Sequence, residues 1–133
     1  MVSSTLKIVA AIVIVVVVVV GAYAALTFPR AVVDFQVSFT MGVDRELKRF
    51  EVPALHDKAQ VEVIINSGSA LWRASIANAN GIIWQHSAAQ GGQTTYRGDW
   101  IALPSGQYNF TFETIGFGEL NANIRVTSKG GFW

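Results

Sequence analysis

The sequence predicts a mainly β fold with one N-terminal hydrophobic α-helix. Residues 1–29 are assigned to the helix, and residues 30–133 to an antiparallel β-sandwich, Ig-like or jelly-roll-like, of about seven to nine strands. Two observations lead to this prediction. No charged residue lies between Ile8 and Leu26. From Arg30 onward, short segments alternate between apolar and polar residues and are separated by turn-forming residues, as in strands with one buried face.

The uncharged run is interpreted as a helix because of its length. The valines from Val15 to Val20 would favour a strand in water, because β-branched side chains lose freedom in a helix. Strands, however, are usually about 3–10 residues long, whereas about 20 apolar residues in helical form cross a hydrocarbon layer of about 30 Å. Inside lipid, an isolated segment satisfies its own backbone hydrogen bonds only as a helix.

The sequence is compatible both with a helix that is retained and with a signal segment that is cleaved. Ala22-Tyr23-Ala24, placed after an apolar run with Lys7 before it, also fits a cleavable secretory signal. If the helix is retained, its small and branched residues are expected to meet other helices or lipid. The residues assigned to this contact are Ile8, Ile12, Val15, Val16, Val19, Gly21 and Ala22.

Four segments of the sandwich alternate most clearly, at residues 31–41, 60–65, 106–113 and 120–127. The inward-facing residues expected there are Val33, Phe35, Val37, Phe39, Met41, Val61, Val63, Ile65, Tyr108, Phe110, Phe112, Leu120, Ala122, Ile124 and Val126. Shorter strand candidates lie at 50–52, 71–77, 81–86 and 95–103. Turn signals lie at 66–69, 78–81, 91–92, 104–106 and 116–118. The segment 44–51, rich in charge of both signs, is expected to be a solvated turn or strand edge.

The segment from Pro104 to Phe112 adds two details. A Pro-Ser-Gly turn followed by Tyr108 resembles the closing hairpins of small Ig-like and jelly-roll domains, in which a tyrosine tethers a corner. Asn109-Phe110-Thr111 matches the N-glycosylation acceptor pattern, with Asn109 on the outward face of its strand. Asn109 is therefore a candidate glycosylation site.

Composition and motifs argue against catalysis and nucleic-acid binding. Of ten Lys and Arg residues only Lys7 precedes the apolar run, so the remaining nine balance nine Asp and Glu, and no basic face is expected. Cysteine is absent, and His56 and His86 show no metal-ligand spacing. No nucleophile or phosphate-binding motif occurs. We therefore expect no enzyme activity, no catalytic residue, no metal and no cofactor.

The tryptophans are expected to serve packing. Trp72, Trp84 and Trp100 lie inside strand candidates, where burial in the core is the expected use. Phe132 and Trp133 follow a flexible diglycine, and two large apolar rings in that place either fold back onto the sandwich or dock on a neighbouring molecule. Docking on a partner is the prediction.

An apolar N-terminal helix joined by a short junction to a chemically quiet β-sandwich resembles the archaeal type IV pilins. In that family the helix packs into a filament core and a small β-sandwich decorates the outside. The resemblance implies a filament subunit at the cell surface, with copies of itself as partners and membrane lipid around the helix before assembly. The chain departs from the pattern at Thr5, where bacterial pilins carry glutamate, and at Lys7, which a filament core must accommodate. No leader with a basic residue and glycine precedes the run, although a processed chain would lack one.

Two other functions remain open. The helix could anchor a single-pass accessory subunit of a larger membrane complex, with the sandwich outside the cytoplasm. Lys7 favours only slightly an N-terminus on the cytoplasmic side. Alternatively, the sandwich could be a tethered ligand-binding domain, although no convergent polar residues point to a ligand.

Overall fold

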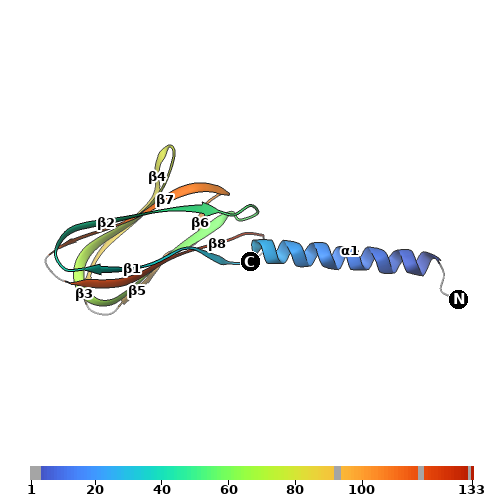
Figure 1. The fold of residues 1–133 in the computed structure, drawn as a ribbon, viewed down its shortest axis with the longest axis horizontal. Helices are drawn as coiled ribbons and strands as arrows, with labels where there is room; N and C mark the ends of the chain where they lie inside the picture. Colours follow the sequence, from blue (N-terminus) through green and yellow to red (C-terminus); the bar gives the residue numbers. More distant parts are fainter. Residues whose placement is uncertain (1–3, 92–93, 117–118, 132) are drawn as a thin grey trace.

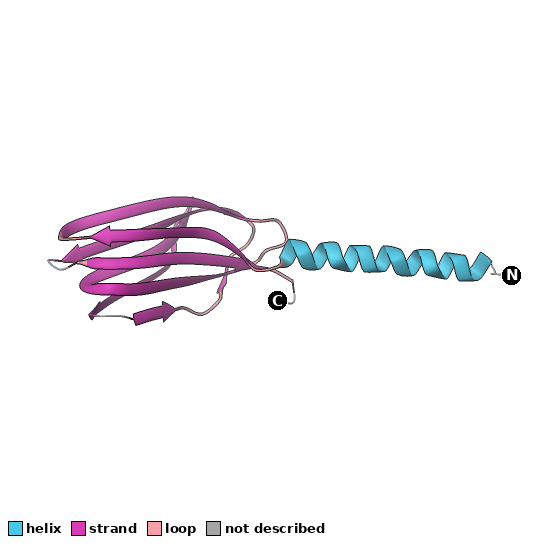
Figure 2. Cartoon of the chain, turned by 60° about the horizontal axis from the view of Figure 1, so that its bottom comes forward, coloured by secondary structure: helices cyan, strands magenta, loops and turns pink. Residues whose placement is uncertain are grey.

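Helix α1 projects from one end of a β-sandwich and continues along the long axis of the molecule (Figures 1 and 2). The structure is a computed structural model that describes residues 4–91, 94–116, 119–131 and 133. The elements are α1 (Ser4–Thr27), β1 (Arg30–Phe39), β2 (Gly42–Val52), β3 (Lys58–Asn78), β4 (Gly81–Gly91), β5 (Thr94–Arg97), β6 (Ile101–Ala102), β7 (Gly106–Gly116) and β8 (Leu120–Lys129).

The strands form two antiparallel layers that share β3. In the first layer β1 pairs with β8, β8 pairs with the first half of β3, and β5 and β6 follow one another along the other side of β3. In the second layer β2 pairs with β7, β7 pairs with the second half of β3, and β4 closes the edge. The first layer thus has the order β1-β8-β3 with β5 and β6 at its edge, and the second has the order β2-β7-β3-β4, which together are the strand order of a jelly roll. The predicted β-sandwich is confirmed, and of the two expected strand orders the chain adopts the jelly roll.

Strand β3 is 21 residues long and passes from one sheet to the other. The sequence prediction of a turn at residues 66–69 is wrong, because the strand continues through this segment. It does so with a register shift between Ile65 and Ser67 and with Gly68 at φ 98°. A side chain at position 68 would place its Cβ 1.7 Å from the carbonyl oxygen of Glu119, so only glycine fits. Polar and glycine residues here bend a strand instead of ending it.

The core lies between the two layers and contains the inward-facing residues that the alternation predicts, except Met41, with Phe35 partly buried against it. The fully buried side chains include Trp72, Phe110, Phe112, Ile65, Ile76, Leu103, Leu120, Ile124, Val61, Val63 and Val126. The predicted corner is present as well, since the Tyr108 hydroxyl donates a hydrogen bond of 2.6 Å to the carbonyl oxygen of Pro104. The corner ties the start of β7 to the loop before it.

Three local predictions are wrong. Met41 is 68% exposed in the turn after β1, because the strand ends at Phe39. Residues 95–103 form two short strands, β5 and β6, interrupted at residues 98–100. Trp100 lies in that interruption and is 37% exposed, so it is not a core residue. For the charged segment 44–51, the sequence predicted a solvated turn or a strand edge. The second alternative is correct, because the segment lies in the edge strand β2.

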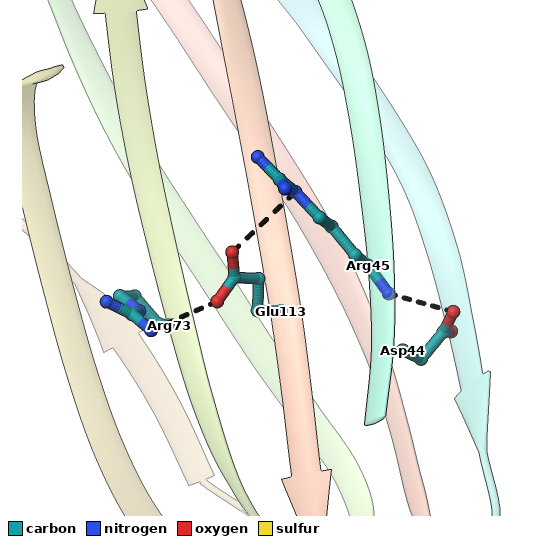
Figure 3. A network of polar contacts seen from close by, with 4 residues as sticks. All are labelled: Asp44, Arg45, Arg73 and Glu113. Atoms are coloured by element: carbon teal, nitrogen blue, oxygen red, sulfur yellow. Dashed lines mark hydrogen bonds and ion pairs between the residues drawn. The ribbon is translucent and has the colours of Figure 1, made fainter. Parts of the chain in front are cut away.

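The outer faces of both sheets carry rows of alternating charge. On the second sheet Glu113 of β7 lies between Arg45 of β2 and Arg73 of β3, at 3.6 and 3.1 Å (Figure 3). On the first sheet the row runs across four strands through Asp34, Arg125, Glu62 and Arg97. Each exposed pair contributes less than about 1 kcal/mol, but opposite charges across strands favour the observed register. The sandwich therefore presents ion-paired, water-compatible faces.

Candidate functional site: the exposed helix and its joint with the sandwich

Most of the exposed large apolar side chains among the described residues lie on helix α1. Its side chains stay exposed over almost the whole length, with Val17 and Val18 at 64% and 63%. Among the described residues it is the one helix that is long and apolar enough to cross a membrane, and none of its apolar window is buried within the chain. A helix that is apolar all round is expected to be covered by other helices or by lipid.

The residues that the sequence assigned to helix contact all lie on α1 and are all exposed. Ile8 and Ile12 are 60% and 57% exposed, and Val15, Val16 and Val19 lie between 53% and 60%. Residues on the remaining sides, such as Val17, are exposed to the same degree. The chain itself therefore selects no face of the helix, and the assignment of these residues, with Gly21 and Ala22, remains a prediction.

The end of the helix is fastened to the sandwich by His56. This residue follows β2 in the loop before β3 and is 2% exposed. Its Nε2 lies 2.8 Å from the Leu26 carbonyl oxygen, and its Nδ1 lies 2.8 Å from Oγ of Ser128 in β8. A carbonyl can only accept, so Nε2 carries the proton and donates, and in a neutral ring Nδ1 accepts from the Ser128 hydroxyl. One imidazole thus joins α1, the β2–β3 loop and β8.

Gly130 adds a backbone hydrogen bond to the same joint, by which we mean the contacts between the last turn of α1 and the sandwich. Its N–H donates to the Thr27 carbonyl oxygen at 3.1 Å. Together with the His56 contact, this bond satisfies two of the last four carbonyls of the helix, which have no partner within it. A Cβ at position 130 would lie 1.8 Å from the Leu55 carbonyl oxygen, so the close approach of these two segments requires glycine.

Trp133 packs onto the helix end of its own chain. Its indole N–H donates to Oγ1 of Thr27 at 2.9 Å, and its ring meets Phe28 edge to face at a centroid distance of 5.1 Å. Of the two alternatives, folding back is therefore the arrangement within the chain. The ring is still 40% exposed, and docking of Trp133 on a neighbouring molecule stays a prediction. Phe132, assigned to the same contact, lies outside the described residues.

The other candidate residues lie away from the joint. Asn109 lies on the outward face of β7, half-buried, at the rim of a hollow of ≈ 520 Å³ that Arg49, Asn78 and Gln107 also line. Its glycosylation stays a prediction. His86 lies within β4 and stacks on Tyr96 at 4.0 Å. Within the described part of the chain, no group of three or more His, Cys, Asp or Glu residues could hold a metal ion.

Sequence reasoning missed the joint because its partners are distant in the chain. His56 lies 30 residues from Leu26 and 72 residues from Ser128. No spacing rule connects such residues. The one available signal was a polar residue, Thr27, directly after a run without charge, and it indicates that something at the end of the helix needs a hydrogen bond.

No protein-family model and no curated protein matches this chain. Solved structures similar to it include PirA, at 12% identity and a TM-score of 0.49, covering 70% of this chain and 92% of that chain. Another is the C-terminal CBM6 of LamC, a marine laminarinase from Zobellia galactanivorans, at 14% identity and a TM-score of 0.47, covering 79% and 94%. A third is the carbohydrate-binding module CBM6cm-2 from Cellvibrio mixtus lichenase 5A in complex with cellotriose, at 16% identity and a TM-score of 0.45, covering 76% and 86%. At these identities and scores the likeness has no bearing on function, and the chain is characterised by its own geometry: an uncovered apolar helix fastened to a jelly-roll sandwich.

Proposed function

We propose that this chain is a non-enzymatic structural subunit of a pilin-like surface filament. The helix packs with the helices of other copies, and the sandwich faces outward. One observation carries the proposal: α1 is exposed on every side, yet its last turn is hydrogen-bonded into the sandwich at Leu26 and Thr27. A helix so placed needs partners outside its own chain.

The two surfaces of the molecule support this division of roles. Burial of apolar area stabilises association by roughly 25 cal/mol per Å², and α1 offers such area around its whole circumference. The sandwich offers charge rows that are already paired, such as Arg45, Glu113 and Arg73 (Figure 3). The helix is therefore the assembling element, and the sandwich is the part that water can surround.

The substitution Val17→Asp tests the proposal. A carboxylate in the middle of α1 costs about 3 kcal/mol or more in an apolar helix bundle or bilayer, because no partner is present there to compensate for lost hydration. We expect the variant to form no filaments while its sandwich stays folded, as judged by electron microscopy and by the near-ultraviolet circular dichroism of the tryptophans. Val17→Leu, which keeps the helix apolar, is the matched control and should assemble. Filaments built from Val17→Asp would overturn the filament proposal.

A second candidate is a single-pass anchored subunit of a larger membrane complex. It is favoured by the aromatic residues at the helix exit, where Phe28 and Trp133 pack edge to face and Tyr23 lies one turn back on α1, as is common at membrane interfaces. In that case Val17→Leu should be recovered only in detergent extracts, together with other subunits. Recovery in filaments sheared from cells would instead support the first candidate.

A further inference from the structure

A hollow of ≈ 510 Å³ opens at the end of the sandwich from which the helix leaves. We call it the basal hollow, and its lining residues are Asp57, Lys58, Trp100, Ala102, Pro104 and Lys129. Its position follows from the joint, because Asp57 and Lys129 directly adjoin His56 and Gly130 in sequence, and those two residues bind Leu26 and Thr27. Asp57 and Lys129 are also linked to each other by a backbone hydrogen bond of 3.0 Å.

Two lysines of the basal hollow lie opposite one another, and Asp57 is the one acidic residue among its lining residues. Lys58 of β3 and Lys129 of β8 are direct register partners, an arrangement that is unfavourable for like charges. Neither forms an ion pair within 4.0 Å with another residue of the described chain, although the charge rows elsewhere on the sheets alternate in sign. Counting Asp57, the hollow has a formal charge of 2 − 1 = +1. Such a pair is suited to an anion that both ammonium groups can share.

Trp100 gives the hollow an amphipathic wall. Its ring is 37% exposed, and the Lys129 Nζ lies 3.9 Å from the ring centroid. Leu55, on the same end of the molecule, is 51% exposed and has a φ of 71°, which bulky residues rarely adopt. The hollow thus combines two ammonium groups with a partly exposed aromatic ring.

We propose that the basal hollow binds the phosphate of an anionic phospholipid headgroup in the bilayer that α1 crosses. This inference rests on the helix lying in a bilayer, before filament assembly or as a permanent anchor. The apolar run from Ile8 to Leu26 is about 28 Å long as a helix, close to the hydrocarbon thickness of about 30 Å. Residues that adjoin the contacts of Leu26 and Thr27 therefore lie at headgroup depth, where tryptophan and lysine interact with lipid most favourably.

Lysine acetylation read by mass spectrometry tests the inference on the intact chain. The protein is reconstituted into nanodiscs of phosphatidylcholine alone or with phosphatidylglycerol, and each disc is treated briefly with an acetylating reagent. We expect Lys58 and Lys129 to react about fivefold more slowly when phosphatidylglycerol is present. Lys48 is the internal control, because it also lies over an aromatic ring, that of Phe35 at 5.3 Å, but belongs to β2. Its rate should not change.

The other outcomes separate the two proposals. If the chain enters the discs but Lys58 and Lys129 react equally in both lipids, the headgroup site is refuted while the membrane placement of the helix stands. If the chain does not co-purify with either disc, the bilayer placement fails, and the headgroup site fails with it. A third arm adds inorganic phosphate to the detergent-solubilised chain. Protection of Lys58 and Lys129 there, equal to that in phosphatidylglycerol discs, would show a site for free phosphate and overturn the lipid assignment.

Discussion

At Thr27 a single hydroxyl connects the last turn of α1 with the C-terminal Trp133. Its Oγ1 donates to the Tyr23 carbonyl oxygen at 2.8 Å and accepts from the Trp133 indole at 2.9 Å, while the residue itself is fully buried. A buried polar group is tolerated when both its donor and its acceptor functions are used. Here the donor function is used within the last turn of the helix, and the acceptor function holds the Trp133 ring on it.

The substitution Thr27→Val should lower the free energy of unfolding by about 1–2 kcal/mol, because the Trp133 indole loses its acceptor while the volume of the side chain is retained. Thermal unfolding of the detergent-solubilised chain, followed by tryptophan fluorescence, measures the change. Thr95→Val is the matched control, since Thr95 is exposed on β5, and its effect should stay within about 0.5 kcal/mol. Equal effects of the two substitutions would show that the Thr27 bonds contribute nothing.

Among the elements, β3 depends on one backbone position, that of Gly68. Gly68 combines a φ of 98° with a contact that leaves no room for a Cβ against Glu119. Gly42 has a similar φ of 93° but open space around it. Substitutions at the two glycines therefore distinguish the free-energy cost of a left-handed backbone from the additional cost of a steric clash.

We expect Gly42→Ala to destabilise the sandwich by about 1–2 kcal/mol, which is the cost of the left-handed conformation alone. Gly68→Ala should cost clearly more, because the backbone of β3 or of the segment at Glu119 must also move. Thermal unfolding of both variants under the same conditions gives the comparison. If Gly68→Ala is no worse than Gly42→Ala, the close approach seen at Glu119 is not required for the fold.

The strands could be predicted from sequence where buried and exposed side chains alternate along a short segment. Val61, Val63 and Ile65 face inward as their spacing predicts, because side chains of a strand alternate between its faces. The continuation of β3 through residues 66–69 was not predictable, because glycine and polar residues also form turns and only the distant contact with Glu119 decides between the two. The joint escaped prediction for the same reason: the bonds of His56 depend on tertiary structure.

For the whole molecule, the joint links helix and sandwich at several points, and we expect the two parts to move as a single body. His56, Gly130 and Trp133 bind the last turn of α1 through separate hydrogen bonds, and the helix follows the long axis of the sandwich (Figure 2). Subunits with a fixed angle between their two parts can repeat in an ordered assembly, whereas a hinged subunit would present many angles. Fixed geometry is thus an advantage for either proposed role.

Spin labels can measure this rigidity, because the chain has no native cysteine to interfere. Cysteines introduced at Val17 and at the exposed Glu51 should give a narrow distance distribution in detergent. Adding His56→Leu should broaden it, because the Leu26 carbonyl and the Ser128 hydroxyl lose their shared partner. The control is His86→Leu, which alters a ring stacked on Tyr96 within the sandwich and should leave the width unchanged. A distribution that is already broad without His56→Leu would contradict the rigid joint.

The direction of β1 has a mechanical consequence. The strand begins at Arg30, just beyond the helix, and runs away from it beside β8 (Figure 1). Tension applied through α1 therefore acts along β1, across hydrogen bonds that lie perpendicular to the pull. Bonds stressed in this way resist shear together instead of opening one after another like a zipper. From β8 the force reaches β3 and, through it, both sheets, so that the sandwich can bear a load applied at its helix without peeling apart from one edge.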